Sequence, residues 1–386
     1  MNTLTRSRNS YVRLTPLLAA AAAVLMTSLA PLPAAAQGLG LIAEAPARGV
    51  WAPAVEEARR IVLARMEESG IPGMSAAVAV DGRVVWAEGF GYADVENRVP
   101  VGAETKFRIA SISKALTAAA VGRLVQEGRL DLDAPVQRYV PSFPRKRWPV
   151  TTRELAGHVA GVRHYRGNEF MNRKHYTDVV DALEIFRNDT LLFEPGTRFS
   201  YSTYGWNLIS AVVQGAAGER FLTYMRENVL RPLGMDDTVA EHPDSIITHR
   251  AHFYQRGEDH RLLNAPWVDD SNKWAGGGYL STASDLVKYG SAYLHPGFFD
   301  QETIDLLFTS QRTRDGKETG YGIGWFTRTS GGRRTVWHTG GAMGGSTILL
   351  LYPDEGVAVA LLANLQGVRH TRTARAIADL FTSVRR

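Results

Sequence analysis

Two residues of this sequence, Ser111 and Lys114, have types and a spacing that suit chemistry. They open a stretch, Ser111 to Gln126, that is apolar on nearly every side and is therefore predicted to form a buried helix. The free N–H groups and the dipole at a helix N-terminus favour developing negative charge. Residues three apart on a helix are neighbours, and desolvation lowers the pKa of a lysine so that it can act as a base. The pair can therefore activate the Ser111 hydroxyl for attack on a carbonyl without a histidine.

An isolated Ser-x-x-Lys pair also has a simpler explanation. Ser111 would then be only a helix N-cap, and Lys114 only a solvated residue of the first helical turn. For the pair alone this explanation is preferred, so the surrounding sequence has to decide between the two.

The surrounding sequence favours the chemical interpretation. "FRIASISK" is similar to the first motif of the penicillin-recognising serine enzymes, a family that includes class C β-lactamases, D,D-peptidases of the peptidase S12 type, related esterases and D-aminopeptidases. The resemblance continues, in the order of the family, through "DLDAPVQRYVP", "EPGTRFSYSTYGWNLIS", "RPLGMDDT", "GGGYLSTASDL" and "WHTGGAMGG". A narrower resemblance, in "YVPSFP", "GVRHY" and "HTGG", is to the serine β-lactamase-like proteins found in animal mitochondria. The family resemblance covers roughly residues 71–365, which is most of the chain.

The resemblance implies a second motif of the form Tyr-x-Asn, which "YST" fills with Tyr201 and Thr203. A tyrosine near the lysine can act as general base in acylation or as acid to the leaving group, and the residues leave open which of Lys114 and Tyr201 is the base. Thr203 stands where the family has asparagine, so an amide that could bond a substrate carbonyl is absent.

The third motif is Lys-Thr-Gly in the family and His338-Thr339-Gly340 here, followed by Gly341. Its glycines would let a substrate backbone approach closely. The resemblance implies that the N–H groups of Gly341 and Ser111 form an oxyanion hole. A histidine has a reference pKa of roughly 6.5, so near neutral pH much of His338 would lack the charge of the family's lysine.

Five further residues receive weaker interpretations. Asn364, in "LLANLQG", occupies a place where relatives carry a substrate-side asparagine. His158 matches a recurrent family segment and is interpreted as a structural residue that packs the loop under the cleft. "GVRHY", with Arg163, His164 and Tyr165, is equally compatible with the rim of the cleft and with a loop cap.

The elements that position these residues are predicted from the pattern of the chain. Strands are expected near both ends, with a hairpin at Asp81-Gly82 and a later strand at 321–328. Helices are expected between them, one of them at 176–189. The expected fold class is α/β in an α+β layering, with an antiparallel sheet built from both chain ends, flanked by helices, and a mostly helical inserted lobe. The sheet lobe would span about residues 50–110 and 275–386, and the helical lobe about 111–274. The resemblance implies the β-lactamase/transpeptidase-like fold for a single catalytic domain, residues 37–386.

The first 36 residues have the layout of a secretory signal peptide. Arg6, Arg8 and Arg13 precede ten consecutive apolar residues, 17–26, and small residues follow up to Ala36. We therefore expect cleavage near Ala36 and a periplasmic or secreted protein. A mitochondrial transit peptide is the alternative, since such segments are also rich in arginine and poor in acidic residues. A retained anchor is disfavoured, because ten residues are too few for a bilayer core that needs roughly 20.

Composition excludes several classes of function. Without residues 1–36 the formal charge falls from +5 to +2, and no basic run suggests nucleic acid. The chain has no cysteine, no H-E-x-x-H and no G-x-S-x-G, which argues against a thiol enzyme, a zinc hydrolase and an α/β-hydrolase. We expect no metal or organic cofactor, no stable membrane span and a small-molecule or peptide acyl substrate. The oligomeric state is not predicted.

The expected activity is that of an exported serine hydrolase, acting through Ser111, Lys114 and Tyr201 on a small ester, peptide or amide. One alternative is a true β-lactamase or D,D-carboxypeptidase. Another is a non-catalytic scaffold that binds peptidoglycan or a protein partner.

Overall fold

A single antiparallel sheet forms the framework of residues 42–45 and 49–384, the part of the chain that the computed structural model describes. The expected signal peptide lies outside these residues. Across the sheet the strands run in the order β1 (Ile42–Ala45), β3 (Arg83–Asp94), β2 (Gly73–Val80), β13 (Val357–Ala363), β12 (Gly345–Tyr352), β11 (Arg333–Ala342) and β10 (Phe326–Ser330), with β4 (Val99–Pro100) paired to β3.

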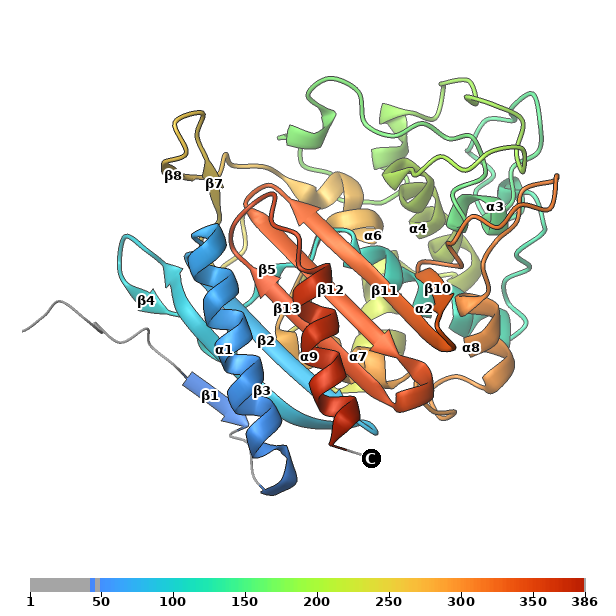
Figure 1. The fold of residues 1–386 in the computed structure, drawn as a ribbon. Coiled ribbons are helices and arrows are strands. Elements are labelled where there is room, and N and C mark those ends of the chain that lie inside the picture. Colours follow the sequence, from blue (N-terminus) through green and yellow to red (C-terminus); the bar gives the residue numbers. More distant parts are fainter. Residues whose placement is uncertain (1–41, 46–48, 385–386) are drawn as a thin grey trace, which may run out of the picture. The chain divides into compact units, whose positions relative to one another are not determined.

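Helices and two small sheets complete the described fold (Figure 1). The α-helices are α1 (Ala52–Ser69), α2 (Ile112–Gln126), α3 (Thr152–Ala156), α4 (Thr203–Ala217), α5 (Phe221–Met225), α6 (Trp274–Gly277), α7 (Ala283–Ser291), α8 (Gln301–Phe308) and α9 (Thr371–Ser383). The small sheets are β5 (Phe107–Arg108) with β9 (Tyr279–Ser281) and β6 (Val239–Ala240), and β7 (Tyr254–Arg256) with β8 (Leu262–Asn264).

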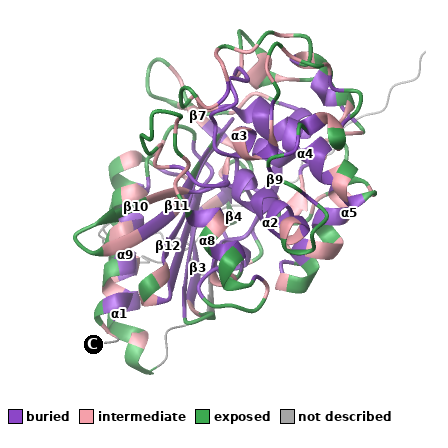
Figure 2. Ribbon diagram, turned by 90° about the vertical axis from the view of Figure 1, so that its right-hand side faces the viewer, coloured by how far each residue is buried: buried purple, intermediate pink, exposed green. Residues whose placement is uncertain are grey.

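The central strands of the sheet are buried on both faces, as Figure 2 shows. Because successive side chains of a strand point to opposite faces, each strand supplies two cores. In β13, Val359 and Leu361 belong to the core that contains α1 and α9, whereas Ala358 and Ala360 belong to the core that contains α2 and α7. The sheet is therefore the middle layer between two sets of helices.

The structure confirms the expected fold class, with a sheet built from both chain ends and helices between them. The predicted hairpin joins β2 to β3, and its turn residues Asp81 and Gly82 have φ of 49° and 77°. Positive φ at both central positions is the geometry that favours Asp-Gly in a two-residue hairpin.

Two predicted elements are shorter in the structure than the sequence suggested. Residues 176–189, expected to be helical, contain only a 3₁₀ helix at Asp181–Ile185. Residues 321–328, expected to form one strand, become extended only from Phe326, because Gly324 has a φ of 80° that turns the chain.

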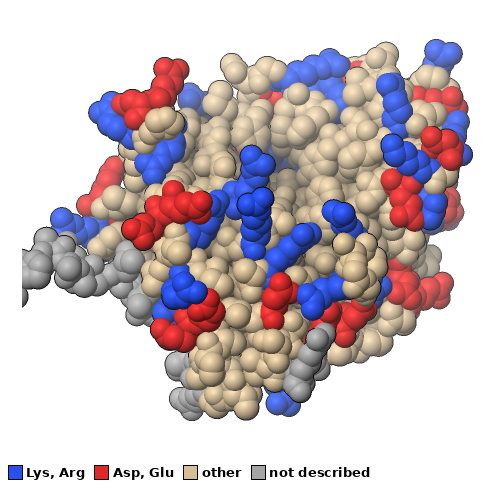
Figure 3. Space-filling model, viewed as in Figure 1, with Lys and Arg blue, Asp and Glu red and all other residues tan. Residues whose placement is uncertain are grey.

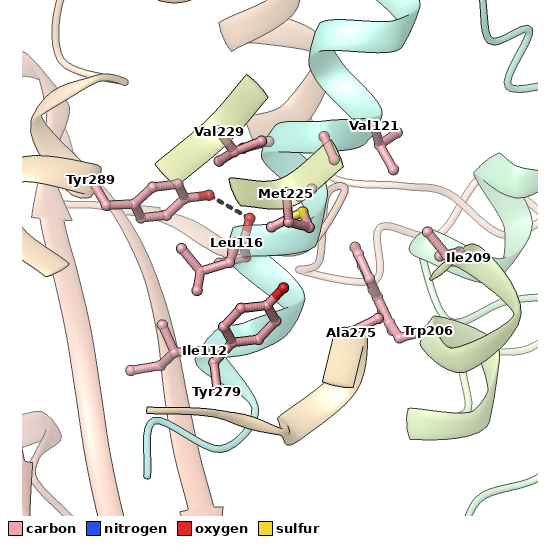
Figure 4. Packing of buried hydrophobic residues seen from close by; sticks show 14 of the residues in the cluster. Ile112, Leu116, Val121, Trp206, Ile209, Met225, Val229, Ala275, Tyr279 and Tyr289 are labelled. Atoms are coloured by element: carbon pink, nitrogen blue, oxygen red, sulfur yellow. Dashed lines mark hydrogen bonds between the residues drawn. The ribbon is translucent and has the colours of Figure 1, made fainter. Parts of the chain in front are cut away.

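Helix α2 is the most deeply buried helix near the middle of the fold, and every residue from Ile112 to Gly122 is buried. Figure 4 shows Ile112, Leu116 and Val121 of α2 among side chains of α4, α5 and β9. The Tyr289 hydroxyl of α7 donates a hydrogen bond to the carbonyl of Ala115. Packing on all sides fixes the position of the residues at the start of this helix.

The outer face over α1 and α9 carries a cluster of cationic residues that are far apart in the sequence. Arg65 of α1 lines a groove with Arg369 and Arg372, which lie at the start of α9. Figure 3 shows Lys and Arg side chains gathered over the middle of this face. The cluster lies on the side of the sheet away from α2, so it is separate from the Ser111 site.

In the described residues, no helix is both long enough and apolar enough to cross a membrane.

Candidate active site

Ser111 lies in a tight turn between β5 and α2. The N–H of Ile112 donates to the carbonyl of Ile109 at 3.1 Å, and the N–H of Ser113 donates to that of Ala110 at 2.9 Å. Ala110 has a φ of 49°, in the left-handed region that residues other than glycine rarely adopt. The turn presents Ser111 as the N-cap residue of α2, at the positive end of the helix dipole.

Lys114, one turn along α2, is fully buried beneath Ser111. Its Nζ lies 3.0 Å from Oγ of Ser111 and 2.6 Å from the carbonyl oxygen of Gly276. Among the described residues it forms no ion pair with a carboxylate. Burial, and secondarily the nearby ammonium of Lys273, lowers the pKa of Lys114 well below its ordinary value. An amine in this position favours its neutral form, which is the form that accepts a proton.

Three histidines surround Lys114, and all of them are neutral near pH 7. Burial is the main cause in each case and the proximity of Lys114 adds to it, which lowers the pKa of His338 to about 3 and that of His164 to about 4. The pKa of His158 is lowered well below its ordinary value for the same two reasons. A pKa lowered this far makes each imidazole a weak proton acceptor near neutral pH.

Tyr201 is positioned by the turn that begins α4. The Ser202 hydroxyl accepts from the N–H of Gly205 at 3.0 Å and donates to the carbonyl of Arg163 at 2.7 Å, which fixes this turn. The Tyr201 ring packs on His158 at 4.2 Å between centroids, and Nζ of Lys114 lies 5.0 Å from its centre. Burial raises the pKa of Tyr201, although a hydrogen bond with Ser111 opposes this effect. The phenol therefore keeps its proton near neutral pH.

Ser111, His164 and Tyr201 meet at a pocket of about 80 Å³, whereas Lys114, His158 and His338 lie outside its lining. The pocket is lined by Ala110, Ser111, His164, Tyr165, Phe170, Tyr201, Thr203, Asp270, Lys273, Gly276, Gly277, Gly341, Ala342 and Met343. Five separate segments of the chain contribute to this lining, so the site depends on the complete fold.

The two glycines of β11 have different roles. A Cβ on Gly340 would lie 2.2 Å from the carbonyl oxygen of Ile109 and 2.2 Å from Oγ1 of Thr347, so no side chain fits there. The space at Gly340 is thus used by the chain itself, rather than by a substrate, and brings β11 against the segment that leads to Ser111. Nothing lies within 4 Å of a Cβ built on Gly341, which lines the pocket.

The remaining residues of the second and third motifs differ in whether they line the pocket. Thr203 is buried and lines the pocket, and its N–H donates to Nδ1 of His164 at 3.2 Å. His338 lies beneath the pocket, outside its lining, with Nε2 3.0 Å from the hydroxyl of Tyr321. Thr339 is exposed and does not line the pocket either.

Asn364 does not take the substrate-side position that was expected. It is fully buried and lies outside the pocket lining. Its Oδ1 accepts from the N–H of Gly73 at 2.8 Å, and its Nδ2 donates to the carbonyl of Tyr92 at 3.0 Å. The amide joins the end of β13 to β2 and β3, so its contacts are those of a structural residue.

"GVRHY" combines both of its proposed roles. His164 and Tyr165 line the pocket, whereas the Arg163 guanidinium holds the loop together. Arg163 donates to both carboxylate oxygens of Glu169, at 2.6 and 2.9 Å, and pairs with Asp189. His158 is buried against Tyr201, in agreement with the expected packing role.

Sequence reasoning missed Asp270 and Lys273, which line the pocket, and Arg108, which supports it. Arg108 is buried and donates to both carboxylate oxygens of Glu241, at 2.7 and 2.9 Å, and to the carbonyl of Met343 at 2.8 Å. The available signal was a charged residue between the apolar residues of "FRI", and an Asp-x-x-Lys just before the glycine-rich block "GGGYL".

Comparison with known proteins agrees with this architecture. Residues 58–382 match the Beta-lactamase family. The serine beta-lactamase-like protein LACTB, mitochondrial, of Homo sapiens is 34% identical, and the match covers 86% of this chain and 80% of that protein.

Two solved structures have the same fold. The octameric penicillin-binding protein homologue from Pyrococcus abyssi is 28% identical with a TM-score of 0.74, and the match covers 85% of this chain and 77% of that one. D-amino acid amidase from Ochrobactrum anthropi SV3 has a TM-score of 0.70 over 84% of this chain and 97% of its own, and its 22% identity supports a common fold alone.

The two glycines of β11 provide a matched test of how the strand is packed. We expect Gly340→Ala to lower the free energy of unfolding by about 1–3 kcal/mol, because its methyl group meets the Ile109 carbonyl. Gly341→Ala, with open space around it, should stay within about 0.5 kcal/mol of the parent. Urea unfolding followed by tryptophan fluorescence measures both. Equal stability of the two variants would contradict this account of the packing.

Proposed function

The chain belongs to the beta-lactamase family, and on that premise we propose that it is a serine hydrolase in which Ser111 forms a covalent acyl intermediate. The observation that carries the proposal is the contact between Nζ of Lys114 and Oγ of Ser111 at 3.0 Å, made by a lysine that is fully buried and has a lowered pKa. A hydroxyl next to a buried neutral amine is a nucleophile next to its own base, because the amine can accept the hydroxyl proton.

In the acylation step the Ser111 hydroxyl gives its proton to the neutral Lys114 amine as Oγ bonds to the substrate carbonyl carbon. The opposite trend in the two pKa values supports this division of roles, since the pKa of Lys114 is lowered and that of Tyr201 is raised. Lys114 is therefore the base. Tyr201 relays a proton to the leaving group as the tetrahedral intermediate collapses and the bond to that group breaks.

Developing negative charge on the carbonyl oxygen is stabilised by backbone N–H groups. Ser111 lies at the N-terminus of α2, and Gly341 lines the opposite side of the pocket without a side chain in the way. Two such donors form the oxyanion hole, and loss of one donor typically costs about 3–4 kcal/mol of transition-state stabilisation. Water then attacks the acyl group, with the same amine and phenol exchanging protons, and releases the acid product.

The preferred substrates are small esters or peptide-like amides. The pocket is about 80 Å³, and the family's third-motif lysine is replaced by His338, whose pKa of about 3 leaves it neutral. His338 also lies outside the pocket lining, so it offers no charge to the carboxylate of a lactam. Both features favour small acyl donors over penicillins and cephalosporins.

Two alternatives remain distinct from this proposal. A true β-lactamase or D,D-carboxypeptidase would use the same residues on a larger substrate. A non-catalytic scaffold would leave Ser111 unreactive, and the contact of Lys114 with Ser111 argues against it.

We also propose that residues 1–36 direct export, with cleavage near Ala36. The human relative is mitochondrial by name, and a mitochondrial destination is the alternative for this chain. N-terminal sequencing of the mature protein, with its compartment, separates these two.

Intact-protein mass spectrometry tests the nucleophile directly. The protein is mixed with a panel of acyl donors (esters and amides) and with a fluorophosphonate, which is a phosphonyl donor. We expect a single adduct, located on Ser111 by digestion, and no adduct in Ser111→Ala. The reason is that Ser111 is the serine in contact with Lys114. An adduct on Ser113 or Ser202 instead, or none from any donor, would contradict the proposal.

Substitution of Lys114 tests the base. Lys114→Ala should slow acylation at least about 10²-fold, because proton transfer by a positioned group typically contributes that much. Lys114→Arg should not restore the rate, since a guanidinium cannot accept a proton near neutral pH. Stopped-flow acylation by a chromogenic ester measures the rates, and Lys288→Ala, on the exposed side of α7, is the control. A parent-like rate in Lys114→Arg would reduce Lys114 to a structural role.

Turnover of nitrocefin separates the ester and lactam assignments. We expect a kcat/KM well below the usual enzymatic range of about 10⁴–10⁸ M⁻¹s⁻¹, and higher values for small chromogenic esters. The physical reason is the neutral, buried His338 in place of a cation. Nitrocefin hydrolysis within that range would instead identify a β-lactamase.

A further inference from the structure

The wall of the Ser111 pocket contains a buried ion pair that the proposed mechanism does not use. Asp270 and Lys273 are the acidic and basic residues among the described residues that line the pocket. Their Oδ1 and Nζ atoms are 2.6 Å apart, and the two side chains are only 3% and 6% exposed. Both belong to the 3₁₀ helix Asp270–Lys273 that leads directly into α6, the helix whose Gly276 contacts Lys114. A buried charge pair beside a nucleophile calls for an explanation, since burial of charges is costly.

The stem of Lys273 runs alongside the nucleophile's own turn. A Cβ on Gly277 would lie 3.8 and 3.9 Å from Cδ and Cε of Lys273, and 3.8 Å from the carbonyl carbon of Ala110. Gly277 thus separates the lysine stem from the residue that precedes Ser111. A Cβ at these distances would be in ordinary contact with both, so the lysine stem and the turn that presents Ser111 lie on either side of Gly277.

The ammonium of Lys273 retains capacity for another partner. Besides Asp270, its Nζ contacts the carbonyl oxygen of Phe170 at a long 3.4 Å, and it lies 5.2 and 5.8 Å from the ring centres of Phe170 and Tyr165. An ammonium has three N–H donors. Its two oxygen partners in the described residues leave one donor for the pocket that Lys273 lines.

A second group of charges lies behind the pocket. Arg108 pairs with Glu241, and Arg250 lies 3.8 Å from the same carboxylate. Together with Asp270 and Lys273, this cluster holds three cations and two carboxylates. Lys273 is the one of these cations that reaches the pocket lining.

We propose that Lys273, held in place by Asp270, is a specificity-determining residue that binds a carboxylate carried by the acyl part of the substrate. The inference rests on the proposed function, because the acyl part is the part that stays in this pocket on Ser111. The substrate class is then a short ester or amide of a dicarboxylic acid, with one carboxylate free.

Matched pairs of esters test the inference. 4-Nitrophenyl hemisuccinate differs from 4-nitrophenyl butyrate only by a carboxylate in place of a methyl group, and the hemiglutarate differs from the valerate in the same way. We expect the parent protein to prefer the carboxylated ester of at least one pair. The preference, expressed as the ratio of the two kcat/KM values, should fall about 10–100-fold in Lys273→Met, the effect of losing one charge-assisted hydrogen bond.

Two further variants distinguish loss of the Lys273 charge from misfolding as the cause of a lost preference. Asp270→Asn combined with Lys273→Met removes both charges, so that no unpaired carboxylate is left buried, and it should lose the preference as well. Lys288→Met breaks an ion pair of the same Asp-x-x-Lys spacing on α7, outside the pocket, and should keep the preference.

The outcomes distinguish a failure of this inference from a failure of the proposed function on which it rests. If the neutral esters acylate Ser111 but neither pair shows a preference, or the preference survives in the double variant, the pair is only structural and the inference is overturned. If no ester of either kind acylates Ser111, the proposed function fails and the inference fails with it.

Discussion

The site depends on one physical constraint, a lysine amine that is buried with no carboxylate among the described residues paired to it. Lys114 is fully buried, and its oxygen neighbours are the Ser111 hydroxyl and the Gly276 carbonyl. An isolated charge in such a place is disfavoured, so burial lowers the pKa of the Lys114 amine well below its ordinary value. The three neighbouring histidines are neutral for the same reason. The burial that would destabilise a purely structural lysine is what suits Lys114 to the role of base in the proposed mechanism.

The rest of the fold maintains that burial while leaving Ser111 accessible. Helix α2 is packed on all sides, the turn at Ala110 exposes the serine at its end, and α6 covers the lysine. Strand β11 completes the pocket because Gly340 lets it approach the Ile109 carbonyl closely. Segments from both ends and the middle of the chain thus converge on one amine and one hydroxyl.

Much of this arrangement could be predicted from the sequence. Apolar runs near both ends, the Asp-Gly hairpin and the apolar run after Ser111 indicated the sheet and the buried helix. The Ser-x-x-Lys spacing indicated the contact between the two side chains, because residues three apart on a helix are neighbours.

Other features depend on contacts distant in sequence and could not be predicted. Asn364 was expected near the substrate, but its amide is used by the backbone of Gly73 and Tyr92, and only the register of the sheet decides this. The positions of His338 under the pocket and Lys273 in its wall were equally hidden. A residue's type indicates which chemistry it can perform, whereas its direction relative to the pocket follows from the tertiary structure.

The protonation state of Lys114 is the central claim, and NMR titration of the protein labelled with ¹⁵N at lysine Nζ measures it most directly. The Lys114 resonance is assigned by its loss in Lys114→Arg. We expect it to have the chemical shift of a neutral amine near neutral pH, with a midpoint well below the ordinary lysine value of 10.5, because burial disfavours the charged form. A resonance that remains that of an ammonium up to pH 10 would contradict the account.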